Sequence, residues 1–306
     1  MNIIENLQKV YPLSKEEVEF FIQSAPRRYK VHFIEKRNGR GLREIAQPTA
    51  ELKIIQRWIT KKFINKLPVH DAAMAYRLGK GIKNHASSHA QQKYLLKLDF
   101  KDFFPSIKPR DLKLHLVNHT DIPKEDILVI LKLLFRYDKS KRGFSLSIGA
   151  PSSPSVSNTI MYPFDEMVSD YCKKRKIKYT RYADDLAFST NQPHILDVLQ
   201  NYIRELCRSL KYPRLELNEE KSVFTSKKFR RQLTGLTLTN EGKISLGRDK
   251  KRLIRAMAHN YKLNKLAPNE TLRLRGWLAF ALSVEPGYVE SIERMLGKDI
   301  YEKLMK

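Results

Sequence analysis

Two adjacent carboxylates, Asp184 and Asp185, stand at a sharp turn between two runs of residues that favour β-strands. The surrounding segment is KYTRYADDLAFST, and a carboxylate-bearing tip of this kind can hold a divalent cation. A third carboxylate, Asp99, ends a nearly continuous apolar run that predicts a buried strand. Because neighbouring strands in a sheet lie only about 4.8 Å apart, we expect these three carboxylates to meet at one sheet edge.

Three converging carboxylates are suited to phosphoryl transfer. This reaction uses two hard cations about 3.5–4 Å apart, one at the attacking oxygen and one at the leaving oxygen, and oxygen ligands suit magnesium. The alternative for an isolated Asp-Asp turn is a solvated bend, because aspartate is a common turn residue. The combination of the pair with Asp99 therefore carries the prediction of a two-metal polymerase site.

Length and composition indicate a folded protein with a sizeable core, since the chain has 306 residues and 42% of them are hydrophobic. The longest apolar stretches, such as residues 127–135, are too short and interrupted to span a bilayer, and residues 1–9 lack a secretory signal. Only Cys172 and Cys207 are present, so neither a disulfide framework nor a structural zinc is indicated. We expect a cytoplasmic protein with no membrane partner.

The net charge of +25, from 58 Lys and Arg against 33 Asp and Glu, favours a polyanionic partner, and nucleic acid is the natural candidate. Basic clusters at 227–231 and 248–255 predict an RNA-binding surface, whereas a generally basic surface explains solubility but not the clustering. Membrane binding is disfavoured because the clusters lack an apolar opposite face with aromatic anchors. The predicted RNA contacts in these clusters are Lys227, Lys228, Arg230, Arg231, Arg248, Lys250, Lys251, Arg252 and Arg255.

Capping and periodicity predict the elements that position these residues. Ser14 to Glu17 has the capping-box pattern, so a helix begins there and ends near Pro26. Residues 29–36 and 42–48 alternate like the strands of a hairpin with a basic turn between them. Further helices are predicted at 49–67, 111–119, 125–137, 155–175 with a bend at Pro163, and 194–210; extended segments at 214–226 and 231–247; and helices over the remainder of the chain.

In order and spacing, the motifs resemble those of reverse transcriptases, and more narrowly the bacterial retron reverse transcriptases, over nearly the whole chain. The matching segments are QPTAELKIIQRW (47–58), LKLDFKDFFPSI (96–107), GAPSSPSVSN (149–158), TRYADDLAFS (180–189), LNEEKS (217–222), LTGL (233–236) and RGWLAFALSV (275–284). The resemblance implies an α+β fold of the right-hand polymerase type, with fingers, a palm of antiparallel sheet packed on helices, and a helical thumb. The implied domains are 1–90 (N-terminal helix and fingers), 91–236 (palm with interleaved fingers helices) and 237–306 (RNA-binding thumb).

The resemblance also implies roles for the carboxylates. Asp99 would bridge two magnesium ions, Asp184 would be the principal second ligand, and Asp185 would lie beside them. The backbone carbonyl of Phe100 would complete the coordination, with manganese as a substitute metal. Phe104 corresponds to the gate residue that collides with a ribose 2′-hydroxyl, so deoxynucleotides are the expected substrates; a core aromatic is the alternative for Phe104 and the better interpretation of neighbouring Phe103.

Further residues are implied to bind the incoming nucleotide. The loop of Gly149, Ala150 and Pro151 would lie beneath its base and sugar, where small residues let a backbone approach a ligand closely; a simple turn is the alternative. The residue before this loop is Ile148, where many relatives have glutamine. Lys221 would lie near the departing pyrophosphate and stabilise charge or donate a proton, with a solvated lysine as the alternative. Arg43 and Lys36 are candidates for holding the triphosphate.

Two elements of the retron family are present in altered form. An Asn-Ala-x-x-His element appears as residues 85–89, with His85 in place of asparagine, and a Val-Thr-Gly element appears as residues 233–235. For His85 and His89 the resemblance implies contacts to RNA or to the palm, and ordinary surface histidines are the alternative. A metal-binding pair is rejected because no suitable third ligand is nearby in the sequence.

The implied reaction is RNA-templated DNA synthesis from deoxynucleotides on a cognate structured non-coding RNA. In retrons a guanosine 2′-hydroxyl of that RNA is the primer, which yields a branched RNA–DNA product (msDNA), and the system acts in anti-phage defence with a separately encoded effector protein. One alternative is a group II intron-like reverse transcriptase with ordinary 3′-hydroxyl priming, which usually carries additional regions. The other is a non-catalytic RNA-binding scaffold, against which the intact carboxylate set argues.

Overall fold

A four-stranded antiparallel sheet, the palm sheet, lies at the centre of the computed structural model, which describes residues 2–36, 39 and 41–306. Its strand order is β6-β7-β3-β8. The strands are β3 (Tyr94–Asp99), β6 (Lys178–Tyr182), β7 (Asp185–Thr190) and β8 (Val223–Ser226). Strands β3 and β7 are buried on both faces. The run before Asp99 is therefore almost continuously apolar and does not alternate with polar residues. The predicted α+β class is confirmed.

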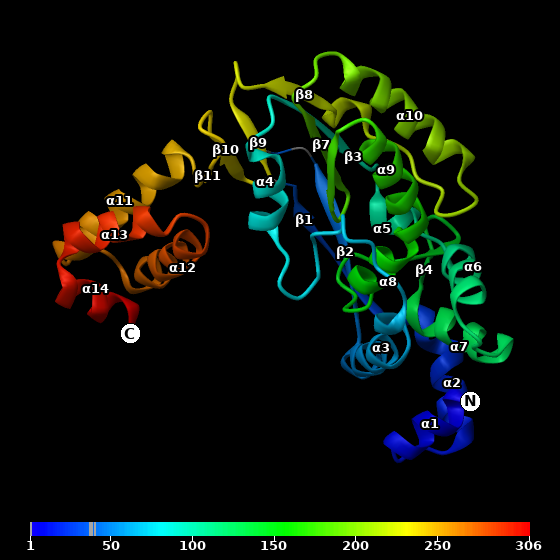
Figure 1. Ribbon diagram of the computed structural model, residues 1–306. Coiled ribbons are helices and arrows are strands. Elements are labelled where there is room, and N and C mark those ends of the chain that lie inside the picture. Colours follow the sequence, from blue (N-terminus) through cyan, green and yellow to red (C-terminus); the bar gives the residue numbers. More distant parts are fainter. Residues whose placement is uncertain (1, 37–38, 40) are drawn as a thin grey trace.

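Helices cover both faces of the palm sheet (Figure 1). On one face lie α9 (Tyr162–Lys174) and α10 (Ile195–Ser209), and on the other lies α4 (Ile82–Ala90). The predicted bend at Pro163 is a complete break, since α8 (Ser153–Ile160) ends before α9 begins with this proline in its first turn. In the first turn of a helix, backbone N–H groups have no hydrogen-bond partner within the helix. A proline, which has no N–H, is therefore well tolerated at this position.

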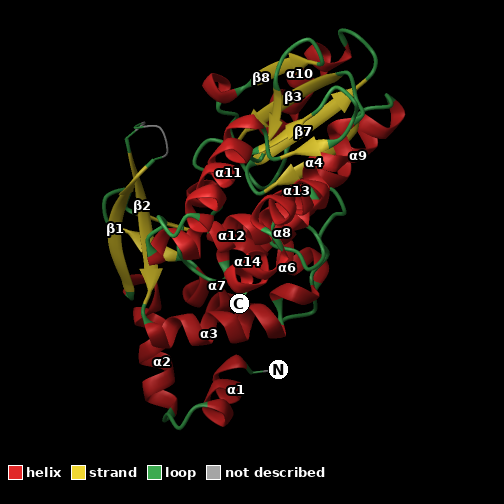
Figure 2. Cartoon of the chain, turned by 90° about the vertical axis from the view of Figure 1, so that its left-hand side faces the viewer, coloured by secondary structure: helices red, strands yellow, loops and turns green. Residues whose placement is uncertain are grey.

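The N-terminal part forms the fingers. Its elements are α1 (Ile3–Val10), α2 (Lys15–Ser24), the hairpin β1 (Tyr29–Glu35) and β2 (Leu42–Pro48), α3 (Ala50–Lys62), and the short helices η1 (Ala25–Arg27) and η2 (Ile64–Lys66). The predicted capping box is confirmed, because Ser14 and Glu17 exchange hydrogen bonds of 2.8 and 3.2 Å. The hairpin is confirmed and projects as a two-stranded ribbon (Figure 2). Of its basic turn, Arg37, Asn38 and Arg40 lie outside the described residues.

Between β3 and α8 the chain adds more of the palm and fingers. These elements are α5 (Phe103–Ser106), α6 (Pro109–His119), α7 (Lys124–Leu134), β4 (Arg136–Asp138) and β5 (Gly143–Ser145). The predicted helices here are confirmed, but the β4–β5 hairpin and helices α1 and α4 were not predicted. The predicted extended segment 214–226 is only partly extended, because η3 (Glu219–Lys221) interrupts it before β8.

The C-terminal part is the helical thumb, joined to the palm by a small sheet. The small sheet contains β9 (Arg231–Leu233), β10 (Leu236–Leu238) and β11 (Ile244–Ser245), and the thumb helices are α11 (Arg248–Lys262), α12 (Pro268–Val284), α13 (Pro286–Leu296) and α14 (Lys298–Met305). A second hydrophobic core runs through these helices and reaches Ala86 and Ala90 of α4. The domain limits at 90 and 236 therefore stay predictions, since this core extends across both. Among the described residues, no helix combines the length and hydrophobicity of a membrane span.

Candidate active site

The palm sheet places the three predicted carboxylates at one end. Asp99, the last residue of β3, is the register partner of Asp185, the first residue of β7. Asp184 lies in the turn just before, and its carbonyl accepts a hydrogen bond of 3.2 Å from the Phe100 N–H. Asp99 is only 8% exposed, whereas Asp184 and Asp185 are partly exposed. The expected convergence at one sheet edge is therefore observed.

The turn that carries the aspartate pair is tight and strained. Tyr182 and Asp185 are the last register pair of β6 and β7, so only Ala183 and Asp184 connect the strands. Ala183 has a φ of 56°, in the left-handed region that an alanine seldom adopts. Strain of this kind costs about 1–3 kcal/mol and persists only where surrounding contacts enforce it.

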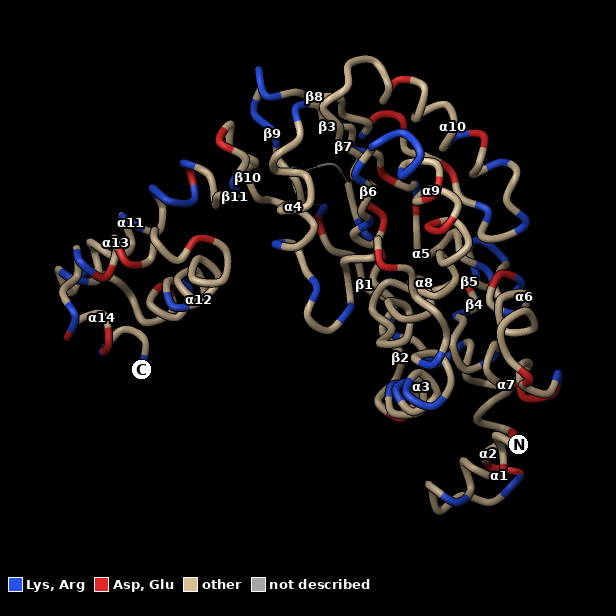
Figure 3. The backbone as a smooth tube through the Cα atoms, in the orientation of Figure 1, with Lys and Arg blue, Asp and Glu red and all other residues tan. Residues whose placement is uncertain are grey.

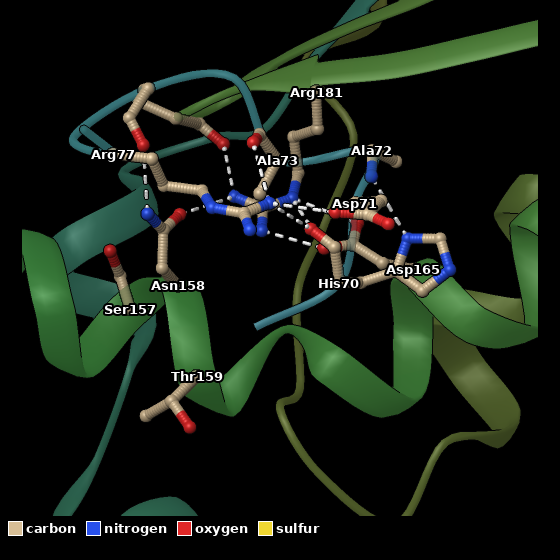
Figure 4. Close-up of polar contacts among 12 residues, drawn as sticks. His70, Asp71, Ala72, Ala73, Arg77, Ser157, Asn158, Thr159, Asp165 and Arg181 are labelled. Carbon is tan, nitrogen blue, oxygen red and sulfur yellow. Dashed lines mark hydrogen bonds and ion pairs between the residues drawn. The ribbon is translucent and has the colours of Figure 1, made fainter. Parts of the chain in front are cut away.

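Those contacts come from Arg181, whose guanidinium donates a 3.1 Å hydrogen bond to the Ala183 carbonyl. Arg181 and Asp165 of α9 are both 0% exposed and form an ion pair with N–O distances of 2.7 and 2.9 Å. Arg181 also donates to Asn158 of α8 (Figure 4). Asn158 in turn donates to the Ala75 carbonyl. This network was not predicted from the sequence, although both Asn158 and Arg181 lie in segments that match the family motifs.

The segment before α4 completes the support beneath the turn. The Arg181 N–H donates to the Ala72 carbonyl at 2.8 Å, and the Arg181 carbonyl accepts from the Met74 N–H at 2.7 Å. This pairing places Tyr76 beside Asp184, which together with burial raises the pKa of the Tyr76 phenol, burial being the larger cause. Tyr76 was not predicted as a site residue, and its φ of 59° shows a second strained position next to the carboxylates.

The carboxylates repel one another. Burial, followed by the charge of Asp99, raises the pKa of Asp184. Burial, followed by the charges of Asp184 and Asp99, raises the pKa of Asp185 to about 7. Lys221 opposes this repulsion, since its ammonium donates to a carboxylate oxygen of Asp99 at 2.8 Å.

The donor set fits a hard divalent cation. Besides the carboxylates, the Phe100 carbonyl is available, because no residue that the structure describes donates a hydrogen bond to it. Oxygen donors carrying excess negative charge are what magnesium and related ions prefer. Across residues 2–36, 39 and 41–306, however, no three His, Cys, Asp or Glu side chains already stand close enough to form a metal cluster. The carboxylate of Asp99 faces Lys221 instead.

The raised pKa of Asp185 predicts a pH-dependent stability. The folded protein binds this proton more tightly than the unfolded chain, whose pKa is near 3.8, so metal-free stability should fall as pH rises from about 4 to about 7. In thermal melts with a chelator, the Tm of Asp185→Asn should not decrease over this pH range. At neutral pH its Tm should be higher than that of the unmodified chain by on the order of 3 °C. Asp121→Asn, at an exposed position, is the control. Equal pH profiles for Asp185→Asn and the unmodified chain would contradict the prediction.

Of the predicted nucleotide contacts, Lys221 and Arg43 lie near the carboxylates. Phe103 is buried and stacks on Phe100 with ring centroids 5.7 Å apart, while Phe104 is partly exposed. Arg43 on β2 lies close enough to Asp184 to lower that residue's pKa, although burial dominates. Lys36 is exposed directly after β1.

The loop at Gly149 lies against the β1–β2 hairpin. A Cβ at Gly149 would lie 3.1 Å from the Ala46 carbonyl oxygen, and its φ of 116° also favours glycine. The close neighbour that requires a glycine here is therefore strand β2. The predicted approach of a nucleotide to this loop stays a prediction. The Ile148 carbonyl accepts a hydrogen bond from the Ala46 N–H, Ala150 is buried and Pro151 is partly buried, so this loop is fastened to the fingers hairpin.

The predicted RNA contacts of His85 and His89 are wrong, and so is the surface alternative, because both side chains are 0% exposed. His89 lies between Ser189 and Thr180 at 2.6 and 2.7 Å, and His85 lies 2.6 Å from the same Thr180 hydroxyl. Burial lowers the pKa of both rings, that of His85 to about 3, so they are neutral. The alternative of a palm contact is what the structure shows, because α4 packs directly on β6 and β7.

The basic clusters separate into buried and exposed members. Arg231 is 1% exposed and donates to the carbonyls of Gln92, Ala90 and Thr239, so its predicted RNA contact is wrong. On α11, Lys250 donates to the Gly235 carbonyl at 2.7 Å and Lys251 pairs with Glu285. The remaining basic residues of these clusters lie at the surface, with Lys227 partly exposed and Arg230 paired with Asp249 at 3.3 Å: Lys227, Lys228, Arg230, Arg248, Arg252 and Arg255. Figure 3 shows the basic residues along α11.

Comparisons with known proteins agree with this geometry. Residues 34–238 match the family described as reverse transcriptase (RNA-dependent DNA polymerase). The chain is 38% identical to the Retron Ec83 reverse transcriptase of Escherichia coli, over 100% of this chain and 98% of that protein. It is 30% identical to the Retron Ec86 reverse transcriptase of Escherichia coli, over 99% and 93% of the two. Apo telomerase from Candida tropicalis resembles it in fold, with a TM-score of 0.52 over 88% of this chain and 58% of that one, at 11% identity.

Proposed function

Because this chain belongs to the reverse transcriptases, and within them to those of bacterial retrons, we propose that it copies a cognate structured RNA into DNA at Asp99, Asp184 and Asp185. Membership makes it an RNA-directed DNA polymerase. The observation that supports the proposed site is the register of Asp99 opposite Asp185 next to a turn that presents Asp184. The charge repulsion among them is relieved when cations bind.

We propose magnesium as the cation, held by the three carboxylates and the Phe100 carbonyl, with manganese as a substitute. Two such ions, when bound, activate a primer hydroxyl and neutralise the departing pyrophosphate. Reverse transcriptases generally use divalent metal ions, and the oxygen donors here suit either metal.

The protein's own groups would act around that centre. The Lys221 ammonium lies beside the Asp99 carboxylate. It would be released to interact with the pyrophosphate when Asp99 binds metal. Arg43, on the neighbouring hairpin, would hold triphosphate oxygens, and the exposed Lys36 would assist. The Gly149 to Pro151 loop would form the floor of the nucleotide site, kept rigid by its attachment to β2. Arg181 would keep the Ala183 turn in place while these groups exchange partners.

The retron relatives support the finer parts of the proposal. We propose that a guanosine 2′-hydroxyl of the same RNA is the primer, that the product is branched msDNA, and that synthesis takes place in the cytoplasm. A role in anti-phage defence with a separately encoded effector belongs to the same proposal. Sequence similarity over essentially the full length of Retron Ec83 reverse transcriptase favours this over an intron-type enzyme.

One assay tests the proposed function. The purified protein, magnesium and labelled deoxynucleotides are combined with the structured RNA transcribed beside its gene, and the product is treated with a debranching enzyme. The proposal expects DNA whose 5′ end is released from RNA only by debranching. An enzyme that extends an annealed 3′-primer as readily as its own RNA would instead favour ordinary priming.

Phe104 provides a prediction about substrate choice. Replacing the partly exposed ring in Phe104→Val should reduce discrimination against ribonucleotides by roughly 10- to 100-fold, because the expected collision with the 2′-hydroxyl is lost. The ratio of kcat/KM for deoxynucleotides and ribonucleotides measures this. Phe103→Val is the matched control, since that ring is buried on Phe100, and it should lower Tm without changing the ratio. A ratio unaffected by Phe104→Val would remove Phe104 from the gate.

A further inference from the structure

A hollow lined by several lysines and amides lies at the end of the palm sheet opposite the carboxylates. It has a volume of about 640 Å³, and its lining includes Lys173, Lys176, Lys178, Asn191 and Gln192. Strand β6 runs from Lys178 to Tyr182, the residue before the turn of the site, so it separates the two ends by roughly 13 Å. A molecule in this hollow would therefore contact the protein outside the catalytic centre.

The loop from α9 to β6 is the most basic stretch near the hollow. With the end of α9 and the first residue of β6 it forms the run Lys173, Lys174, Arg175, Lys176, Ile177 and Lys178, and all except Ile177 are exposed. Within the described part of the chain, only Lys173 has an acidic partner, Asp170 at 3.8 Å. Figure 3 shows this loop as a continuous basic segment above α9. Five positive charges in six residues are costly to leave together unless a polyanion neutralises them.

Neighbouring strand ends extend the positive charge. The Lys227 N–H donates to the Lys93 carbonyl at 3.0 Å, and the Lys93 N–H donates to the Asn191 side chain at 2.8 Å. The ends of β8, β3 and β7 thus bring Lys93 and Lys227 beside the hollow. We call the group Lys93, Lys173, Lys174, Arg175, Lys176, Lys178 and Lys227 the distal basic surface. Lys227, predicted as a contact of the C-terminal clusters, belongs to this surface by position, because it follows β8 of the palm.

One member of the distal basic surface is already held in place. The Arg175 guanidinium lies 3.7 Å over the Tyr171 ring, and Tyr171 stacks on Tyr202 with centroids 3.8 Å apart. An arginine fixed on an aromatic ring loses less conformational freedom when it binds a phosphate than a free side chain does.

The chemistry of the lining selects among polyanions. Lysines match phosphates, while the side-chain amides of Gln92, Asn191 and Gln192 can both donate to and accept from ribose hydroxyls. Among the less polar residues of the lining, Cys172 and Ile177 are buried, and Tyr179 is only partly exposed with its hydroxyl bonded to Asp165, so none projects as a free anchor for a protein partner. These features favour the sugar-phosphate backbone of RNA over an acidic protein.

We propose that the distal basic surface binds the backbone of a folded RNA stem and so anchors the RNA while its template segment reaches the carboxylates. The inference rests on the proposed function for the identity of the RNA. The direct contact itself is independent of catalysis, since it requires only phosphates and ribose hydroxyls.

Three exposed lysines of the hollow form the test variant, Lys173→Gln/Lys176→Asn/Lys178→Gln, in the full-length chain. Asparagine is chosen at 176 because that residue has a φ of 56°, which asparagine tolerates. The matched control removes three exposed lysines from the N-terminal part and α7, Lys9→Gln/Lys15→Gln/Lys124→Gln. The probe is a fluorescent RNA hairpin long enough to span two minor grooves, titrated at several salt concentrations.

The proposal expects the test variant to lose about tenfold in affinity at low salt. It also expects the log–log salt slope to become shallower by roughly 2 to 3, because three phosphate contacts disappear. Extension of a short annealed primer–template should keep its kcat, and the control variant should match the unmodified chain. Unchanged hairpin affinity and slope would overturn the proposal. The proposal would also be overturned if the test variant bound the hairpin normally but bound polyglutamate, added as a competitor, more weakly. That result would indicate an acidic protein partner.

The two proposals fail separately. If the unmodified chain does not copy the RNA transcribed beside its gene, the proposed function fails, yet hairpin binding still tests the distal basic surface. If copying occurs but the test variant binds the hairpin normally, only the distal basic surface is rejected.

Discussion

Asp184→Asn should lower the rate of DNA synthesis by about a thousandfold or more, because a lost ligand removes several kcal/mol of charge stabilisation from the transition state. The substitution keeps the size of the side chain and removes one of three mutually repelling charges. Since burial and Asp99 raise the pKa of Asp184, the metal-free variant should be at least as stable as the unmodified protein. Single-turnover extension with magnesium and an RNA template measures the rate.

The control for this experiment is Asp102→Asn. Asp102 is exposed, lies three residues after Asp99 and has a φ of 45°, which asparagine also tolerates. It should retain nearly full activity, and both variants should bind RNA as the unmodified chain does. If Asp184→Asn kept more than about a tenth of the activity under these conditions, Asp184 would not be a ligand of the reacting metal ions.

Arg181→Met should destabilise the protein by about 3–5 kcal/mol, because it leaves the charge of Asp165 buried without a partner. Both side chains are 0% exposed, and they are joined by three close contacts, so solvent cannot compensate. The Ala183 carbonyl would also lose its donor, and the strained turn would lose its support. Denaturant unfolding measures the stability, and kcat on the folded fraction measures the effect on the site.

A second variant separates positioning from stability. Arg181→Met/Asp165→Asn removes the buried charge but leaves an oxygen that still accepts the Tyr179 hydroxyl bond, which is 2.7 Å in the unmodified protein. Much of the stability should return, while kcat should stay low, because the Ala183 carbonyl still has no donor. Arg181→Lys should recover kcat only in part, since lysine lacks the planar fork. Recovery of kcat together with stability in the double variant would show that Arg181 serves folding alone.

Much of the carboxylate site could be predicted because its signals are local. A buried strand needs a continuous apolar run, and a two-residue turn needs polar or small residues, so Asp99 and the Asp184 pair are visible as strand end and turn. The same is true of the capping box at Ser14 and the break at Pro163. Each depends on a handful of adjacent residues.

Other features depend on residues that are distant in the sequence. The family resemblance implied contacts of His85 and His89 to RNA or to the palm, and the clustering of basic residues placed Arg231 at a surface that binds RNA. All three side chains are buried in the structure because each one forms hydrogen bonds with residues of other elements. These bonds offset the free-energy cost of removing a polar side chain from water. The packing of Gly149 against β2 was likewise not predicted, because it joins two segments that are about a hundred residues apart.

By itself, the amino-acid sequence determined the α+β class and the polymerase family through the resemblance of its motifs, and it singled out the three carboxylates through a buried apolar run and a tight turn. Only the tertiary structure decided that Asp99 faces Asp185 in register, that Arg181 and Asp165 hold the turn between them, and that Lys93 and Lys227 join the α9–β6 loop in one surface. The physical reason is that burial and electrostatic energy depend on distances between side chains, and strand pairing creates those distances between residues far apart in the chain.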